Sequence, residues 1–78
     1  MTLKDEVFKI LAEAMGPAAG PFLERQCKWR LNKSAESLVA SDLPTLARWT
    51  EIGTSGILNP DVAAKLASRI RALAGTWL

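Results

Sequence analysis

The chain has 78 residues, 49% of them apolar, with a formal net charge of +2 and a pI near 9.0. The apolar fraction excludes disorder caused by a shortage of hydrophobic side chains, and no apolar run approaches the ~18 residues that a membrane-spanning helix needs. His is absent, which removes most acid–base relays, serine triads and common metal sites. We therefore expect one small domain over residues 1–78 that is not an enzyme and holds no metal or cofactor.

Cysteine usage and the first residues favour a cytoplasmic location. Cys27 is the only cysteine, so no disulfide framework can form within the chain, and a single thiol suits a reducing compartment. The start MTLKDEVFK is charged too early for a secretory signal peptide. The mild positive charge permits nucleic acid or an acidic partner without requiring either.

An amphipathic helix is expected over residues 2–15. Thr2 and Asp5 have the spacing of an N-terminal cap, with a carboxylate placed to meet free backbone donors. Apolar residues then recur at i, i+4, i+7, i+8 and i+11 as one helical stripe: Leu3, Val7, Ile10, Leu11 and Ala14, widened by Phe8 and Met15. Gly16 is expected to end this helix.

The stretch GPAAGPFLERQCKWR, residues 16–30, opens a second helix with two Gly-Pro pairs. Its start is left open between Pro17 and Pro21, because proline is tolerated in a first helical turn. In either case residues 22–31 are expected to be helical. Two apolar rows predict a central helix with two neighbours: Ala19, Leu23, Cys27 and Leu31 in one row, Phe22 and Trp29 in the other. A place in the first row favours a buried Cys27 over a nucleophile.

Two shorter helices are expected in the middle of the chain. Ser34 is placed to cap the first, which would run to residue 40. Ser41 or Asp42 is placed to cap the second, which Gly53 would end. The following segment, GTSGILN, is expected to be a loop or a single turn that carries Ile57 and Leu58 inward.

The last helix has a strong start signal at Asn59-Pro60-Asp61. Its apolar residues have helical spacing: Val62, Leu66, Ile70 and Leu73. Gly75 is expected to end it, with Trp77 and Leu78 folding back onto the helix end. No segment alternates with period two, so the predicted fold is all-α, a compact bundle of four to five short helices without a β-sheet.

Two short motifs resemble known functional sites. Residues 53–56, GTSG, resemble the GXXG loop of KH nucleic-acid-binding domains, but the expected lack of strands and of a basic residue in the loop favours a turn between helices. Glu36-Ser37-Leu38 resembles the Asp-Ser-Leu site of acyl carrier proteins, which are strongly acidic four-helix domains. This chain is net basic, so a carrier-like function with Ser37 as the acceptor is kept as a remote alternative.

Basic residues gather in two segments, which supports a second hypothesis of nucleic-acid binding. In this alternative the third and fourth expected helices, residues 34–40 and 43–52, form a helix-turn-helix with 43–52 as the recognition helix, and the cations contact phosphates. The candidate residues are Lys28, Arg30, Lys33, Arg48, Lys65, Arg69 and Arg71. The competing interpretation is a solvated face that keeps an apolar chain soluble.

Three Trp in so small a chain favour a protein interface, because an indole needs room for a large ring and a partner for its N–H. We expect one or two of them to complete the core, and Trp29 to be the exposed one. The candidate site for a protein partner, or for a second copy in a homodimer, is Phe22, Arg25, Lys28, Trp29 and Arg30. Binding would occur by helix packing through an apolar groove rimmed by Lys and Arg.

A Gly-Pro-x-Ala helix start, an apolar-apolar-x-Arg helix, an Asp-Leu-Pro segment and a final amphipathic helix follow one another along the chain. The matching residues are Gly16, Pro17, Ala19, Phe22, Leu23, Arg25, Gln26, Asp42, Leu43, Pro44, Ala47 and residues 64–73. This order resembles a family of small helical modules in bacterial signalling proteins, where they lie beside receiver, kinase or roadblock-type domains. The resemblance implies an accessory or interaction role in a bacterial cytoplasm rather than an activity. The second pair, Gly20-Pro21, departs from the pattern.

Overall fold

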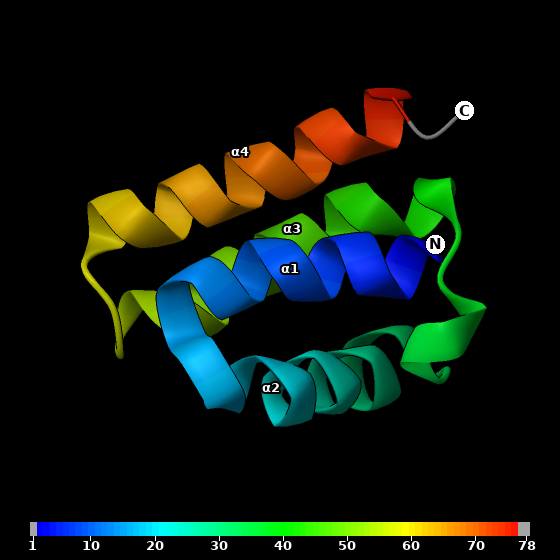
Figure 1. Cartoon of the computed structure of the whole chain (residues 1–78), viewed down its shortest axis with the longest axis horizontal. Coiled ribbons are helices and arrows are strands. Elements are labelled where there is room, and N and C mark those ends of the chain that lie inside the picture. The colour runs from blue at the N-terminus through cyan, green and yellow to red at the C-terminus, as the bar shows by residue number, and fades with distance from the viewer. Residues whose placement is uncertain (1, 77–78) are drawn as a thin grey trace.

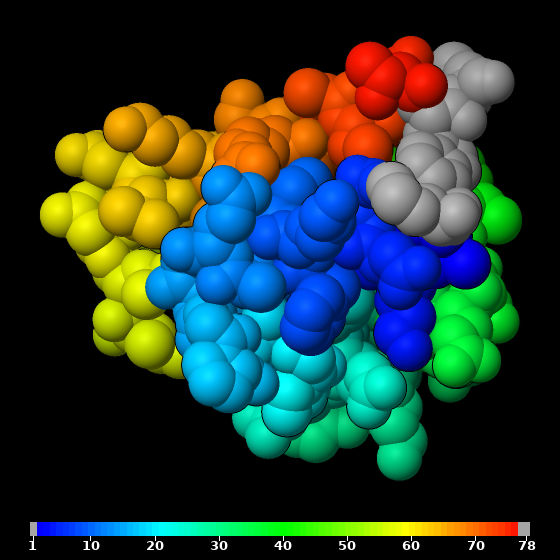
Figure 2. All heavy atoms as spheres, viewed as in Figure 1, coloured from blue at the N-terminus to red at the C-terminus, as the bar shows by residue number. Residues whose placement is uncertain are grey.

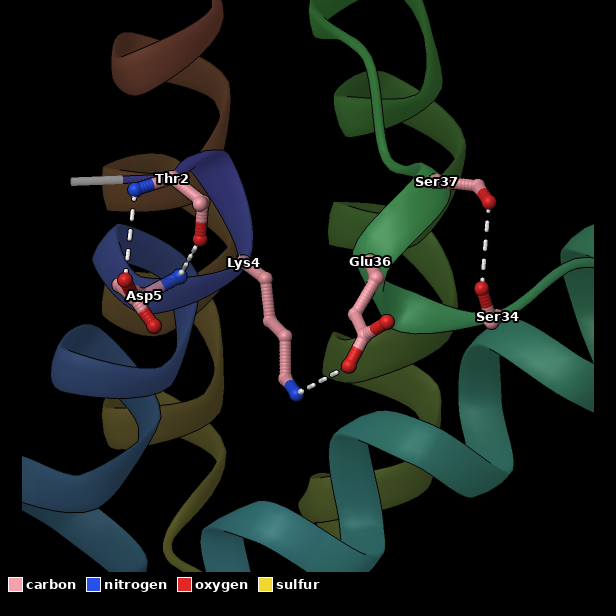
Figure 3. Close-up of polar contacts among 6 residues, drawn as sticks. All are labelled: Thr2, Lys4, Asp5, Ser34, Glu36 and Ser37. Carbon is pink, nitrogen blue, oxygen red and sulfur yellow. Dashed lines mark hydrogen bonds and ion pairs between the residues drawn. The ribbon is translucent and has the colours of Figure 1, made fainter.

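The first helix, α1 (Leu3–Met15), begins as its sequence predicts. In a computed structural model that describes residues 2–76, Thr2 Oγ1 accepts a hydrogen bond from the Asp5 backbone N–H at 3.2 Å, and the Thr2 N–H donates to Asp5 Oδ2 at 3.3 Å. Figure 3 shows both bonds of this capping box. Gly16 ends α1 with φ of 61°, a left-handed value that favours glycine.

The second helix starts between the two prolines that the sequence left open. Gly16–Ala18 form a 3-10 turn that contains Pro17, and α2 (Ala19–Gln26) has Pro21 as its third residue. Both prolines therefore lie where a helix has free N–H positions, so neither missing donor costs a hydrogen bond.

The helix continues from α2 into a π-helical turn, Cys27–Leu31, and stops at Asn32. Asn32 has φ of 55° and ψ of 42°, a left-handed conformation that Asn tolerates better than most residues. The N–H groups of Asn32 and Lys33 both donate to the Cys27 carbonyl, the second at 3.2 Å. The Cys27 carbonyl, which lies at the C-terminal end of the helix, therefore has hydrogen-bond donors.

The prediction of a short helix from Ser34 to residue 40 is wrong. Only Ala35–Ser37 form a 3-10 turn, after which Leu38 leaves the helical region with ψ of 136°. Ser34 Oγ bonds Ser37 Oγ at 3.1 Å instead of capping a backbone N–H (Figure 3). Ala35 and Leu38 are both buried, and one 3-10 turn is enough to place residues i and i+3 on the same side.

A second 3-10 turn, Ala40–Asp42, leads into α3 (Leu43–Ser55). Asp42 does not cap α3 with its side chain. Its Oδ2 instead reaches back to accept from the Val39 N–H at 3.2 Å and from Lys33 Nζ at 2.7 Å. The carboxylate therefore joins the end of α2 to the start of α3.

Of the three glycines expected to end helices, Gly16 does so, but the other two lie inside helices. Gly53 belongs to α3, which runs to Ser55, and Gly75 belongs to α4 (Pro60–Thr76). Hydroxyl groups bond the last carbonyls of each helix: Ser55 Oγ donates to the Ile52 carbonyl and Thr76 Oγ1 to the Leu73 carbonyl. Trp77 and Leu78, expected to fold back, lie outside the described residues.

The start of α4 confirms the Asn-Pro-Asp signal, since Asn59 Oδ1 accepts from the Asp61 N–H at 2.7 Å. Around it, two residues expected to face the core are exposed: Ile57 retains 72% of its surface and Val62 37%. Phe8 is a third, at 39%, because its ring lies over Gly20 at the edge of the α1–α2 contact.

The helices form two antiparallel hairpins, α1 with α2 and α3 with α4 (Figure 1). Residues 32–42 carry the chain from the end of α2 to the start of α3. The α3–α4 contact is the most extensive, and α1 packs against α2 and α4. In the space-filling view α1 covers the molecule between α4 and α2 (Figure 2). The Cα radius of gyration is 11.0 Å, close to the ~11.5 Å expected of a compact chain of this length.

The core takes one stripe from each helix. Its most deeply buried members are Val7, Leu11, Ala19, Leu23, Cys27, Leu43, Leu46, Ala47, Ala67 and Ile70. The described part of the chain contains no strand, so the all-α prediction is confirmed. The expected count of four to five helices is met only in part: α1, α3 and α4 have 13 residues or more, α2 has eight, and the fifth expected helix is a 3-10 turn.

Thr50 provides a test of the α3 packing. Its Oγ1 is buried without a hydrogen-bond partner among the described residues, whereas the neighbouring Thr54 Oγ1 donates to the Thr50 carbonyl at 2.7 Å. A methyl group of the same shape removes the unmet hydrogen bond, so we expect Thr50→Val to raise the free energy of unfolding by about 1 kcal/mol in urea denaturation. Thr54→Val, the control, should give no gain. A loss of stability in Thr50→Val would contradict the assigned packing.

Asp42 provides a test by pH. Burial by itself raises the pKa of its carboxyl group, but the hydrogen bond from Lys33 and the Val39 N–H outweigh it, and the pKa lies below its ordinary value of 3.8. A lowered pKa contributes stability at neutral pH that is lost as the pH falls through the lowered value. We expect acid to reduce the stability of the wild type more steeply than that of Asp42→Asn, which should already be less stable at pH 7 by about 1–2 kcal/mol. Equal acid slopes for the two proteins would refute this role.

Candidate protein-interaction surface

The most exposed aromatic side chain in the described residues is Trp29, with 69% of its surface accessible. It lies in the π-helical turn that follows α2. Arg25 lies one turn after Phe22 on α2 and shares its side of the helix. The Arg25 guanidinium carbon lies 5.7 Å from the centroid of the Trp29 ring, within the range of a cation–π contact. The indole ring of Trp29 is therefore exposed to solvent and contacts the Arg25 guanidinium.

An open groove of about 270 Å³ begins beside this pair. Its lining is almost entirely apolar: Met15, Ala18, Pro21, Phe22, Arg25 and Ile57. Ile57, in the turn between α3 and α4, forms one wall and is itself exposed. Phe22 is half-buried at the base of α2. The groove thus brings together the end of α1, the first turns of α2 and the α3–α4 turn.

The contact between α2 and α3 fixes this arrangement. A Cβ atom at Gly53 would lie 3.3 Å from two ring atoms of Phe22, closer than most side chains tolerate, so the glycine lets the ring lie directly on α3. Farther along the seam, the Arg30 guanidinium stacks on Trp49 of α3 at 4.1 Å from the ring centroid. We call the surface over this seam the α2–α3 face. It comprises Met15, Pro21, Phe22, Arg25, Trp29, Arg30, Trp49 and Ile57.

The α2–α3 face carries positive charge. Within residues 2–76, neither Arg25 nor Arg30 forms an ion pair. Glu51, the acid of α3, pairs with Arg71 of α4 at 3.9 Å, and Glu24 of α2 lines a different groove. The contacts that the two guanidinium groups make are with tryptophan rings: Arg25 with Trp29 and Arg30 with Trp49. No carboxylate is among the residues of the face.

The structure separates one predicted partner-binding residue from the others. Phe22, Arg25, Trp29 and Arg30 belong to the α2–α3 face, but Lys28 lies on the other side of α2. Lys28 borders a polar groove of about 480 Å³ between the start of α1 and residues 32–36. This groove is crossed by an ion pair, Lys4 Nζ to Glu36 Oε1 at 3.6 Å (Figure 3).

The seven cations of the nucleic-acid hypothesis are not gathered on one surface. Three of them are held in ion pairs: Lys33 with Asp42 at 2.7 Å, Arg69 with Glu13 at 2.6 Å, and Arg71 with Glu51. The hydrogen bond from Arg69 lowers the pKa of the Glu13 carboxyl group, so that pair stays charged. Lys65, Arg69 and Arg71 lie on α4, whereas Lys28 and Arg30 lie at the end of α2.

The two lesser motifs also have assigned places. Residues 53–55 of the GTSG segment are helical, and only Gly56 and Ile57 turn, so the expectation of a turn over the whole motif is wrong. Ser37 is exposed at the end of a 3-10 turn. Cys27 is buried as predicted, and burial raises the pKa of its thiol to about 11. That thiol is protonated at neutral pH.

No protein-family model, curated protein sequence or solved structure matches this chain. The described residues hold no cluster of three or more potential metal ligands, and none of their helices is long and apolar enough to cross a membrane. Of the three Trp, Trp29 is exposed as predicted and Trp49 is half-buried, so the expected completion of the core by one or two Trp is not found in residues 2–76.

Four members of the α2–α3 face were not predicted: Met15, Pro21, Trp49 and Ile57. The sequence placed Met15 and Ile57 in the core by apolar character alone. Trp49 joins the face through Arg30, a contact between residues far apart in the chain. A two-residue signal was available for Ile57, since Gly56 before it and Asn59 after it both mark exposed turn positions.

The seam itself can be tested with a pair of glycine variants. Valine at Gly53 would crowd the Phe22 ring, so we expect Gly53→Val to lower the free energy of unfolding by about 1–3 kcal/mol. Gly56 is the control, because a Cβ there meets nothing within 4 Å and its φ of −87° suits any residue. We expect Gly56→Val to stay within about 0.5 kcal/mol of the wild type. Equal stability of the two variants in urea denaturation would show that α2 does not pack on Gly53.

Proposed function

We propose that this chain is a non-enzymatic protein-interaction module that binds a partner by helix packing on the α2–α3 face. The observation that carries the proposal is the 69% exposure of Trp29 beside an apolar groove. Exposed apolar residues that occur singly are ordinary on proteins, but a cluster with a tryptophan and arginines has the composition of interface hot spots. The resemblance to helical modules beside bacterial signalling domains implies the same kind of role, in the cytoplasm.

The arrangement on the face suits binding rather than core packing. Arg25 and Arg30 each lie on a tryptophan ring, which limits the motion of the long side chains before a partner arrives. Side chains that are ordered in advance lose less conformational entropy on association. A groove of 270 Å³ exceeds the ~150 Å³ cavity known to hold a benzene molecule. It therefore has room for one large apolar side chain of a partner.

Protein binding is favoured over nucleic-acid binding by how the cations are used. Lys33, Arg69 and Arg71 are engaged with carboxylates of the same chain, and each ion pair offsets a charge that phosphate would require. The exposed apolar side chains of the α2–α3 face would gain nothing from a phosphate backbone. Both observations support a protein surface as the partner.

A selection for helical peptides tests this proposal. We expect a displayed library of helical peptides to yield binders to the wild type that do not bind Trp29→Ser, because that change removes the largest apolar side chain of the face. The variant should keep its fold, with a change in unfolding free energy below about 1 kcal/mol, since the ring is exposed. Val62→Ser is the matched control: Val62 is an exposed apolar residue on α4, and its loss should leave peptide binding unchanged. Failure to isolate any peptide that distinguishes Trp29→Ser from the wild type would refute the proposed function.

A further inference from the structure

We infer that the partner of the α2–α3 face is an amphipathic α-helix with acidic side chains beside its apolar stripe. This inference rests on the proposed function and adds the chemistry of the partner. Three observations support it. The apolar contacts on the face have a spacing that suits a helix, the two arginines of the face have no carboxylate partner, and their positive charge opposes binding of a second copy of this chain.

The spacing of the apolar contacts suits a helix. Phe22 lines the groove together with Arg25, one turn later on α2, and the Trp29 ring lies 5.7 Å from the Arg25 guanidinium, so the two apolar contact points are about two helical turns, ~10 Å, apart along the axis. A helical ligand presents residues i and i+7 at the same separation, with i+3 or i+4 between them. One apolar side chain of such a ligand would enter the groove beside Ile57, and another would cover the Trp29 ring.

The charge that such a ligand must bring is negative. Arg25 lies between the two apolar contact points and Arg30 lies next to Trp29, and neither guanidinium has a carboxylate partner in the part of the chain that the structure describes. A partner that covers the face without supplying an acid would remove both cations from water without compensation, which is costly. A Glu or Asp flanking the apolar stripe meets Arg25 with a charge-assisted, bidentate hydrogen bond.

A second copy of this chain is a poorer occupant. A two-fold dimer through the α2–α3 face would bring the positively charged face of one copy against the same face of the other, and the face offers no carboxylate to compensate Arg25 and Arg30. Like charges that meet across an interface oppose association. The homodimer is therefore an outcome of the test rather than the expectation.

The experiment measures how many acidic residues the selected peptides contain and how those residues affect affinity. Binders to the wild type should be enriched in Asp or Glu next to an i, i+4, i+7 apolar stripe. The most enriched peptide is then synthesised in its acidic form and with each acid replaced by its amide, and both forms are titrated against wild type, Arg25→Gln and Lys65→Gln. Lys65 is an exposed cation on α4, so Lys65→Gln matches the change in net charge away from the face.

We expect Arg25→Gln to weaken the acidic peptide about tenfold and the amide form less than about twofold, with Lys65→Gln below about twofold for both. Selected peptides that lack acidic residues, or equal effects of Arg25→Gln and Lys65→Gln on peptide affinity, would overturn the acidic-helix inference. If those peptides still failed to bind Trp29→Ser, the proposed function would stand. Sedimentation that shows a wild-type dimer and a Trp29→Ser monomer would overturn the acidic-helix inference in favour of a second copy. A selection that yields no Trp29-dependent binder overturns both.

Discussion

The approach of α2 to α3 at Gly53 is the contact on which the interaction surface depends. Because Gly53 has no side chain, the Phe22 ring lies directly against α3, and this contact, together with the more extensive packing of α1 on α2, sets the rotation of α2 about its own axis. With that rotation, Ala19, Leu23 and Cys27 enter the core. The adjoining arc of the same helix, which carries Arg25 and Trp29, is left in solvent. Gly53 thus helps to determine which side of α2 is left in solvent.

The exposure of Trp29 follows from the geometry of α2 rather than from a shortage of space alone. Rotating α2 to bury this ring would carry Arg25, its neighbour on the helix face, toward the core and would lift Leu23 and Cys27 out of it. Burying an unpaired guanidinium costs more than burying an indole gains. A chain of 78 residues also has a small core, in which one stripe from each helix already fills the interior. The fold therefore has little means of covering the tryptophan itself.

How much of this could be predicted from sequence depends on how local each signal is. The starts of α1 and α4 were predicted because Thr2 with Asp5, and Asn59 with Asp61, make their capping bonds within a few residues. Gly53 was misassigned as a helix end, since the sequence does not distinguish a glycine that stops a helix from one that admits a neighbouring ring.

The candidate site was predicted in the same uneven way. Phe22, Arg25 and Trp29 share a face because of helical spacing, which sequence reveals. Lys28 was grouped with them by nearness in sequence, yet it points to the opposite groove, where Lys4 and Glu36 form an ion pair. The contribution of Trp49 and Ile57 depends on how α3 and its turn meet α2, and no local pattern encodes that meeting. Local spacing therefore predicts the residues that α2 contributes to the surface, and long-range packing adds Trp49 and Ile57.

The central claim is that the α2–α3 face is the surface on which a partner docks, and nuclear magnetic resonance tests it most directly. In a titration of the isotopically labelled wild type with a selected helical peptide, the claim predicts the largest shifts at the amides of Phe22, Arg25, Gly53 and Ile57 and at the Trp29 indole N–H. Residues along the outer side of α4, such as Lys65, should change little. The largest shifts on α4 and α1, with the Trp29 indole unmoved, would contradict the account.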